Sequence, residues 1–192
     1  KLGGSVITDK HEPETVDVDS LEAAARAIGK AGIAHLVVVH GGGSFGHPAA
    51  EEADVSLTAG TTDTDAIGAI HAAMGTLNGR VIDALQQEGV PAVPVRPFSA
   101  GYRDSKGNVV FPTEGIATML EEGFVPVLHG DVFVSNAAGA TIVSGDELVV
   151  SLAAGLSADA VGLCTTVPGV LDGDGSVIAE IRRFEDVNDV LD

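Results

Sequence analysis

Several residue types are scarce in this sequence, and each scarcity excludes a class of protein. Cys164 is the sole cysteine, so no disulfide can form within the chain, and such usage is typical of a reducing compartment. Lysine and arginine number 10 against 28 acidic residues, which argues against a surface that binds a nucleic-acid duplex. No apolar run reaches the length of a membrane span, and no signal peptide opens the chain. We therefore expect a soluble, cytoplasmic protein with no nucleic-acid or membrane partner.

The shortage of basic residues leaves a formal net charge of -18 on 192 residues, with only four lysines. An acidic, lysine-poor surface resembles that of cytoplasmic proteins adapted to high salt. Exposed carboxylates repel one another across a screening length of about 30 Å at 0.01 M salt but only roughly 3 Å at 1 M. We therefore predict that the melting temperature rises as KCl is increased from 10 mM to 1 M, with sucrose as the control for general exclusion. A melting temperature that stays flat across this range would contradict the halophilic interpretation.

Predicted strands and helices alternate along the chain. Apolar residues make up 45% of the sequence but aromatic residues only 4%, so we expect a core of alanine, valine, leucine and isoleucine. The predicted strands are Leu2–Ile7, Leu36–Val39, Val90–Val95, Phe124–Leu128 and Asp159–Leu163. Helices are predicted over Asp19–Gly32 and Asp63–Gln87, and further helices follow Thr113 and Ser144. An irregular rim is predicted over His47–Thr62. Hairpins are predicted over Tyr102–Phe111 and Phe133–Val143, and the second turns at Asn136–Gly139. This order predicts an α/β fold, a three-layer αβα sandwich with an open, mainly parallel sheet plus β-hairpins, in a single domain spanning residues 1–192.

Three consecutive glycines, Gly41 to Gly43, follow the predicted strand Leu36–Val39, and His40 and His47 flank them. Glycine lets the backbone approach a ligand closely, and exposed amides in such a loop can hold an anion, most often a phosphate. The pattern predicts a phosphate-binding loop at the carboxyl end of a buried strand. The alternative is a plain glycine-rich turn from strand to helix.

Two further loops combine glycine with a charged or donor side chain, at Lys1–Ser5 and Ser144–Asp146. Phosphoryl transfer needs this combination, because its catalysis is mostly positioning and charge neutralisation. Lysines offset the negative charge, glycine amides hold the oxygens, and a carboxylate keeps the lysines oriented. The three loops together therefore indicate a site for phosphoryl transfer.

Other motifs fit less well. Gly41, Gly43 and Gly46 satisfy the dinucleotide-binding pattern, but no strand is predicted between Gly46 and the acidic residue at Asp63 that the pattern would need. No Walker A sequence is present. Asp172–Gly175 lacks the spacing of an EF-hand and is interpreted as a turn, and Cys164 has no nearby histidine to activate it.

The chain resembles the amino acid kinase superfamily, and within it the isopentenyl phosphate kinases. The motifs that carry the resemblance are Lys1–Lys10, Val39–Pro48, His129–Asp131 and Ser144–Asp146, and it covers essentially the whole chain. His47 is the most specific sign, because acetylglutamate kinases lack a histidine at this position. Fosfomycin-type kinases look similar at this loop and remain the nearest rival.

The resemblance implies a role for each candidate residue. Lys1 would bridge the transferred phosphoryl group, Lys10 would contact phosphate from the rim, His47 would bind the acceptor phosphate, and Asp146 would orient Lys1. ATP would contact Lys1, Leu2, Gly3, Gly4, Ser5, Gly43, Thr165, Thr166 and Gly169. The acceptor would contact Gly42, Gly46, His47 and Gly145, with Ile70, Met74 and Leu77 shaping the pocket for its prenyl tail.

The implied reaction is the ATP-dependent phosphorylation of isopentenyl phosphate to isopentenyl diphosphate, in the alternative mevalonate route of isoprenoid biosynthesis. Mg²⁺ would be carried by ATP, so no residue is predicted to bind metal, and a homodimer is expected. Both ends of the chain look cut, and family members continue past Asp192 with a glycine-rich segment whose lysine contacts ATP. We therefore expect this stretch to bind substrate and to transfer phosphate poorly by itself. The alternatives are another phosphate- or phosphonate-directed kinase and a non-catalytic, nucleotide-binding kinase-like module.

Overall fold

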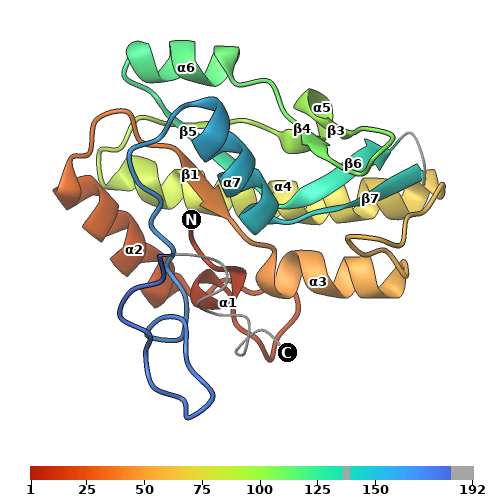
Figure 1. The fold of residues 1–192 in the computed structure, drawn as a ribbon, viewed down its shortest axis with the longest axis horizontal. Helices are drawn as coiled ribbons and strands as arrows, with labels where there is room; N and C mark the ends of the chain where they lie inside the picture. The colour runs from red at the N-terminus through yellow and green to blue at the C-terminus, as the bar shows by residue number, and fades with distance from the viewer. Residues whose placement is uncertain (136–138, 183–192) are drawn as a thin grey trace.

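A parallel sheet runs through the middle of the molecule (Figure 1). The computed structural model describes residues 1–135 and 139–182. The strands of this sheet lie in the order β1-β5-β2, and both strand pairs are parallel. Their bounds are Val38–His40 for β1, Val125–His129 for β5 and Ala92–Pro94 for β2. The carboxyl ends of β1 and β5 therefore lie side by side, with His40 in register with His129.

A second, mixed sheet continues from the first, because only Gly130 separates β5 from β6. Its order is β4-β3-β6-β7, with β6 and β7 antiparallel and β3 parallel to β6. The strands are β3 (Tyr102–Arg103), β4 (Val109–Val110), β6 (Asp131–Ser135) and β7 (Gly139–Val143). Both predicted hairpins are confirmed, although residues 136–138 of the second turn lie outside the described residues.

Helices cover both faces of the parallel sheet. One group consists of α1 (Gly4–Ile7), α2 (Val18–Ala31), α3 (Gly43–Glu52) and α4 (Thr64–Gln87), and the other helices are α5 (Pro97–Ala100), α6 (Glu114–Glu121) and α7 (Gly145–Gly155). Neighbouring strand residues point to opposite faces. Val38 and Val127 accordingly pack in one cluster with residues of α2 and α4, whereas Val39 and Leu128 pack in another with residues of α6 and α7. The predicted three-layer α/β fold is confirmed.

Local signals explain where the long helices begin and end. Asp63 caps α4, accepting hydrogen bonds from the amides of Asp65 and Ala66. Asp17 caps α2 with a bond from the amide of Ser20, and this bond lowers the pKa of Asp17. α2 ends at Gly32, which has the left-handed φ of 56° that glycine adopts without cost.

Three predicted elements are wrong. Leu2–Ile7 is not a strand: Leu2 alone pairs with the sheet, and Gly4–Ile7 forms one helical turn because the glycines let the backbone bend there. The predicted irregular rim begins with α3, which runs to Glu52. Asp159–Leu163 forms no strand in the described structure, since its pairing is reduced to one bridge between Cys164 and Leu2.

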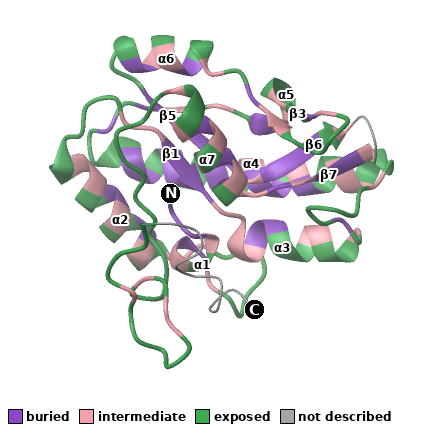
Figure 2. Cartoon of the chain, in the orientation of Figure 1, coloured by how far each residue is buried: buried purple, intermediate pink, exposed green. Residues whose placement is uncertain are grey.

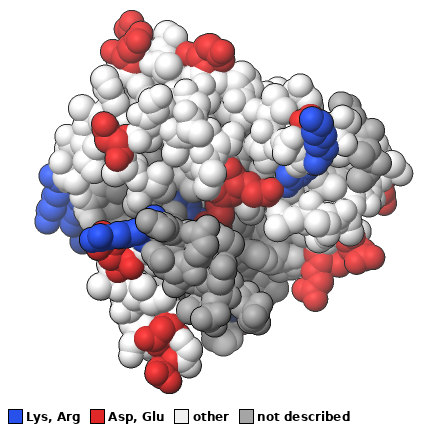
Figure 3. Space-filling view, in the orientation of Figure 1, with Lys and Arg blue, Asp and Glu red and all other residues white. Residues whose placement is uncertain are grey.

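Burial follows this layering (Figure 2). Strands β1 and β5 of the parallel sheet are buried throughout, whereas β2 is only partly buried, and residues 157–182 are mostly exposed. On the face drawn in Figure 3, acidic side chains form several separate groups and no single large patch. Within residues 1–135 and 139–182, no helix combines the length and the apolar character that crossing a membrane requires.

Candidate active site

A cleft of about 960 Å³ lies where the carboxyl ends of the sheet strands meet the glycine-rich loops. Its walls come from segments far apart in the sequence: Lys1–Thr8, Gly41–Glu51, Val55–Leu57, one face of α4, and the turn Val143–Asp146. Ligands in open α/β sheets bind at the carboxyl ends of the strands, so this position suits a substrate site.

The two N-terminal glycine-rich loops touch each other at the floor of the cleft. A Cβ on Gly4 would collide with the backbone nitrogen of Gly43, and a Cβ on Gly41 would lie 2.8 Å from the nitrogen of Gly4. Gly43 also has a positive φ of 49°. No larger residue fits at these crossings, so the two backbones can approach this closely only with glycine at these positions.

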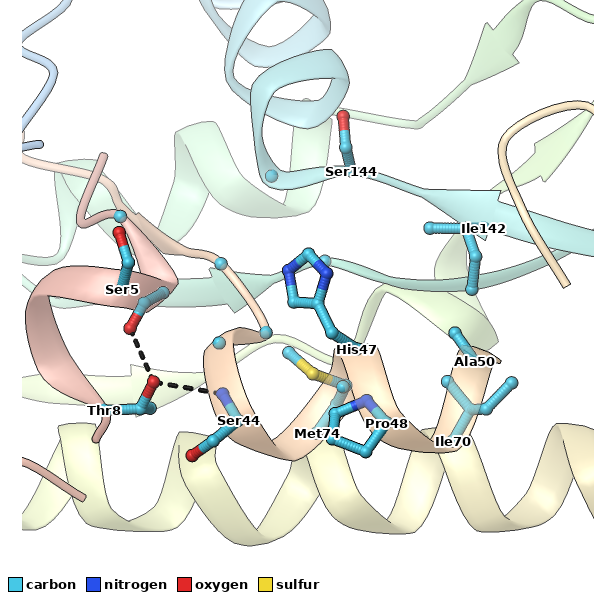
Figure 4. Close-up of a pocket in the computed structure, with 18 of the residues that line it drawn as sticks. Ser5, Thr8, Ser44, His47, Pro48, Ala50, Ile70, Met74, Ile142 and Ser144 are labelled. Atoms are coloured by element: carbon cyan, nitrogen blue, oxygen red, sulfur yellow. Dashed lines mark hydrogen bonds between the residues drawn. The ribbon is translucent and has the colours of Figure 1, made fainter. Parts of the chain in front are cut away.

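Thr8 fastens the two loops together (Figure 4). Its hydroxyl group is buried, donates to the carbonyl oxygen of Gly4 at 2.8 Å and accepts from the amide of Ser44 at 3.0 Å. The amides of Phe45 and Gly46 bond to the carbonyl oxygen of Gly42. In the described part of the chain, the amides of Gly42 and Gly43 bond to no protein acceptor. They lie at the start of α3, where the helix dipole favours an anion.

Pro48 lies inside α3 and has no amide hydrogen to give to the carbonyl oxygen of Ser44. The amide of Glu14 takes that place at 3.0 Å, and the hydroxyl group of Ser44 donates to the carbonyl oxygen of Thr15. These bonds attach the loop before α2 to α3. Lys10 is carried by this loop and thereby held at the rim of the cleft.

The first turn of α7 forms the opposite wall. Ser144 and Glu147 make a reciprocal capping box, and Asp146 lies between them. The Nζ atom of Lys1 lies 2.9 Å from Oδ2 of Asp146, with exposed side-chain fractions of 16% for the lysine and 65% for the aspartate. Because the carboxylate is mostly exposed, this pair adds little to stability. The contact places the ammonium group of Lys1 beside the first turn of α7.

The cleft has a polar end and an apolar end (Figure 4). Ser5, Thr8 and Ser44 lie at one end, and Ala50, Ile70 and Ile142 lie at the other. The imidazole of His47 projects from α3 toward the α7 side of the cleft, between these two ends. Met74 lies beneath α3, and a Cβ on Gly46 would come within 2.7 Å of its sulfur atom. The arrangement suits a molecule with an anionic head and an apolar tail.

The structure brings most of the predicted site residues into this cleft. Those that line it are Lys1, Gly3, Gly4, Ser5, Lys10, Gly42, Gly43, Gly46, His47, Ile70, Met74, Gly145, Asp146 and Thr165. Four others lie elsewhere. Leu2 and Leu77 are buried in the core cluster between the sheet and α2 and α4, and Thr166 and Gly169 lie in the exposed segment after the cleft residue Thr165.

Two buried histidines lie directly behind the glycine-rich loops, in register on β1 and β5. In His40, Nδ1 donates to the carbonyl oxygen of Gly41 at 3.0 Å and Nε2 accepts from the amide group of Asn78 at 3.1 Å. In His129, Nδ1 donates to the carbonyl oxygen of Gly130 at 2.9 Å. The pKa of each is lowered to about 4, mainly by burial and, for His129, also by the nearby His40. Both therefore act as neutral supports for the loops.

Acidification should destabilise the fold through these histidines. The unfolded chain takes up a proton near the ordinary pKa of 6.5, whereas the folded chain does so only near 4. The free energy of unfolding is therefore unaffected by these histidines above pH 6.5. As the pH drops from 6.5 toward 4, it falls by about 1.4 kcal/mol per pH unit for each histidine. Urea unfolding between pH 7 and 5 measures this loss. The variant His129→Asn keeps a donor for the carbonyl oxygen of Gly130, and its unfolding free energy should fall only about half as much between pH 7 and 5 as that of wild type. A pH dependence equal to that of wild type would contradict the assignment.

Sequence reasoning missed several residues that shape the cleft. Asp131 lines it and is fully buried, and its carboxylate binds Nδ1 of His71 at 2.9 Å and the amide of Phe98 at 3.3 Å. Thr8 was also missed. The signal for Asp131 was its place in the His129–Asp131 turn, but nothing local indicates its partner on α4.

Comparison with known proteins gives consistent results. A family model described as the amino acid kinase family matches residues 1–191. An isopentenyl phosphate kinase from Haloferax volcanii is 59% identical over 192 residues, which cover 100% of this chain and 77% of that protein. One from Methanocaldococcus jannaschii is 37% identical over 188 residues, covering 89% of this chain and 69% of that protein. A crystal structure of an isopentenyl phosphate kinase superposes with a TM-score of 0.81 at 36% identity, covering 88% of this chain and 71% of that one.

Proposed function

The chain belongs to the amino acid kinase family, and we infer that it is a kinase that transfers a phosphoryl group from ATP to isopentenyl phosphate. The observation that carries this conclusion is the 59% identity to an isopentenyl phosphate kinase over the whole chain. It is thus a phosphotransferase whose acceptor is itself a phosphate group, and its product, isopentenyl diphosphate, belongs to isoprenoid biosynthesis.

The chemistry requires two anions to approach each other. The acceptor oxygen is already negatively charged, so no general base has to remove a proton from it. The obstacle is electrostatic repulsion, and positioned cations and amide donors lower it. Lys1 and Lys10 both border the cleft, and they are two of only four lysines in an otherwise acidic chain.

We propose that the two ends of the polar region bind different phosphates. The loop of Gly3, Gly4 and Ser5 would hold the phosphates of ATP, and Lys1 would neutralise the phosphoryl group in transfer. Gly42 and Gly145 would hold the acceptor phosphate with His47, from facing sides of the cleft. The ion pair between Lys1 and Asp146 supports this arrangement, because it fixes the lysine before either substrate binds.

The apolar end would receive the isopentenyl tail. Ala50, Val55, Ile70, Met74 and Ile142 line it, and none of these side chains has a charge. A five-carbon chain in this region would be removed from water, which favours binding by about 25 cal/mol per Å² of apolar surface. This contact distinguishes isopentenyl phosphate from inorganic phosphate.

Mg²⁺ is proposed to enter with the nucleotide. Mg²⁺ is commonly held by substrate phosphates, waters and one or two carboxylates, so it needs no cage of protein ligands. Among the described residues, no group of three or more histidine, cysteine, aspartate or glutamate side chains forms such a cage. When bound, the ion would neutralise charge on the phosphate oxygens. We also propose that the protein acts in the cytoplasm as a homodimer.

The substrate assignment is tested with purified full-length protein and ATP, to which one of three acceptors is added: isopentenyl phosphate, fosfomycin or acetylglutamate. We expect ADP release to depend on isopentenyl phosphate, with kcat/KM at least a hundredfold above that for the other two. Preference for fosfomycin would indicate a phosphonate-directed kinase. Nucleotide binding without turnover of any acceptor would indicate a non-catalytic module.

A further inference from the structure

Arg103 has an unusual environment for an arginine in this chain. It lies on β3, only 7% of its side chain is exposed, and its guanidinium group contacts three separate elements. Nε donates to Oγ1 of Thr141 at 3.0 Å, and Nη1 donates to the carbonyl oxygen of Gly107 at 3.0 Å. Nη2 donates to the carbonyl oxygen of Ile142 at 2.7 Å and lies 2.9 Å from both carboxylate oxygens of Glu147. A planar, permanently charged group is the side chain that suits so many acceptors.

Glu147 connects this arginine to the start of α7. Its Oε2 atom accepts a hydrogen bond from the amide of Ser144 at 3.0 Å, while its own amide donates to the hydroxyl group of Ser144. Gly145 and Asp146 lie between these two residues, inside the loop that the capping box closes. A Cβ on Gly145 would lie 3.1 Å from the carbonyl oxygen of His40, so the turn is pressed against the end of β1.

Two adjacent carboxylates in this turn form ion pairs with two different basic side chains. Asp146 pairs with Lys1 on the cleft side, and Glu147 pairs with Arg103 on the far side. Within the described residues, neither Arg103 nor Glu147 lines the cleft. Arg103 contacts the cleft wall through the carbonyl oxygen of Ile142, and it is connected to the charged pair of Lys1 and Asp146 through the first turn of α7.

Resting on the proposed kinase function, we propose that Arg103 is a positioning residue for phosphoryl transfer. By holding Glu147 in the capping box, it fixes the first turn of α7, and the turn fixes the carboxylate of Asp146 and thereby the ammonium group of Lys1. Effective catalysis depends on charges that are placed before the reaction, and small displacements of such groups are costly. Loss of Arg103 should therefore lower kcat and leave substrate binding nearly intact.

Arg103→Gln is expected to lower kcat ten- to a hundredfold with each KM within about threefold of wild type. Arg103→Lys should recover part of kcat, because an ammonium group can still pair with Glu147. Arg26→Gln is the matched control: Arg26 lies on α2, is half exposed and pairs with Glu88 at 3.5 Å, away from the cleft. It should leave kcat within twofold of wild type.

A double variant separates positioning from a general structural role. If Arg103 acts through Asp146, adding Arg103→Gln to Asp146→Asn should lower kcat by no more than about twofold further. A full, additive loss in an active enzyme would overturn the inference without affecting the proposed function. If the full-length wild-type protein fails to turn over isopentenyl phosphate, the proposed function is contradicted instead.

Hydrogen exchange tests the same inference without any turnover. The amides of residues 146–149 should exchange faster in Arg103→Gln than in wild type, and those of α2 should not change. If Arg103→Gln fails to fold, Glu147→Gln takes its place, because glutamine keeps an oxygen for the amide of Ser144 and loses only the charge that pairs with Arg103. Unchanged exchange in the first turn of α7 would overturn the inference.

Discussion

Replacing Lys1 with alanine is expected to lower kcat by two to three orders of magnitude, the largest loss of any single change in this protein. If Lys1 neutralises the phosphoryl group in transfer, its charge matters most at that point, and the loss falls on the transition state and not on bound substrate. Removing one preorganised donor from a developing charge costs about 10²–10³ in kcat in other enzymes. Steady-state kinetics should show each KM within about threefold of wild type.

The same experiment extends to Asp146. Asp146→Asn should lower kcat through Lys1, because the neutral amide no longer orients the ammonium group that lies 2.9 Å from the carboxylate. The double variant should therefore cost less than the sum of the two single changes. Asp83→Asn, an exposed aspartate on α4 that does not line the cleft, is the matched control. Strict additivity of the effects of Lys1→Ala and Asp146→Asn on kcat would show that Asp146 does not act through Lys1.

The second large effect is expected for His47. If its imidazole binds the acceptor phosphate, His47→Ala removes a charge-assisted hydrogen bond of about 1.5–3 kcal/mol. That energy corresponds to a loss of roughly 10- to 150-fold in kcat/KM for isopentenyl phosphate, while the affinity for ATP stays nearly constant.

His47→Gln provides the control, because its amide group can still donate to a phosphate oxygen and should restore part of the loss. His47 is exposed and projects into the cleft, so its replacement should leave the fold intact. An unaltered response to isopentenyl phosphate in His47→Ala would remove His47 from the acceptor site.

Elements with complete local signals could be predicted from the sequence. The helix Thr64–Gln87 has an aspartate cap, a regular apolar face and a clear end, and the structure places it as predicted. Strand β5 is a short apolar run buried on both faces, as expected for a central parallel strand. The glycine-rich loops could be predicted because the residues that define them are consecutive in the sequence.

Features that depend on distant partners could not be predicted. Pro48 argues against a helix locally, yet α3 passes through it because Glu14 supplies the missing hydrogen bond. Arg103 and Glu147 are 44 residues apart, and no periodicity links them. Thr8 looks like any threonine until its bonds to Gly4 and Ser44 are seen. The sequence indicates which residues carry the chemistry, and the tertiary structure shows which residues hold them in place.

The most direct test of the central claim is the phosphorus NMR spectrum of a reaction of purified full-length protein with ATP, Mg²⁺ and isopentenyl phosphate. We predict that the single resonance of the monophosphate is replaced by two mutually coupled doublets of a diphosphate ester, together with one equivalent of ADP. This outcome requires that a phosphate oxygen is the attacking group. Formation of ADP and inorganic phosphate alone, with the isopentenyl phosphate resonance unchanged, would contradict the account.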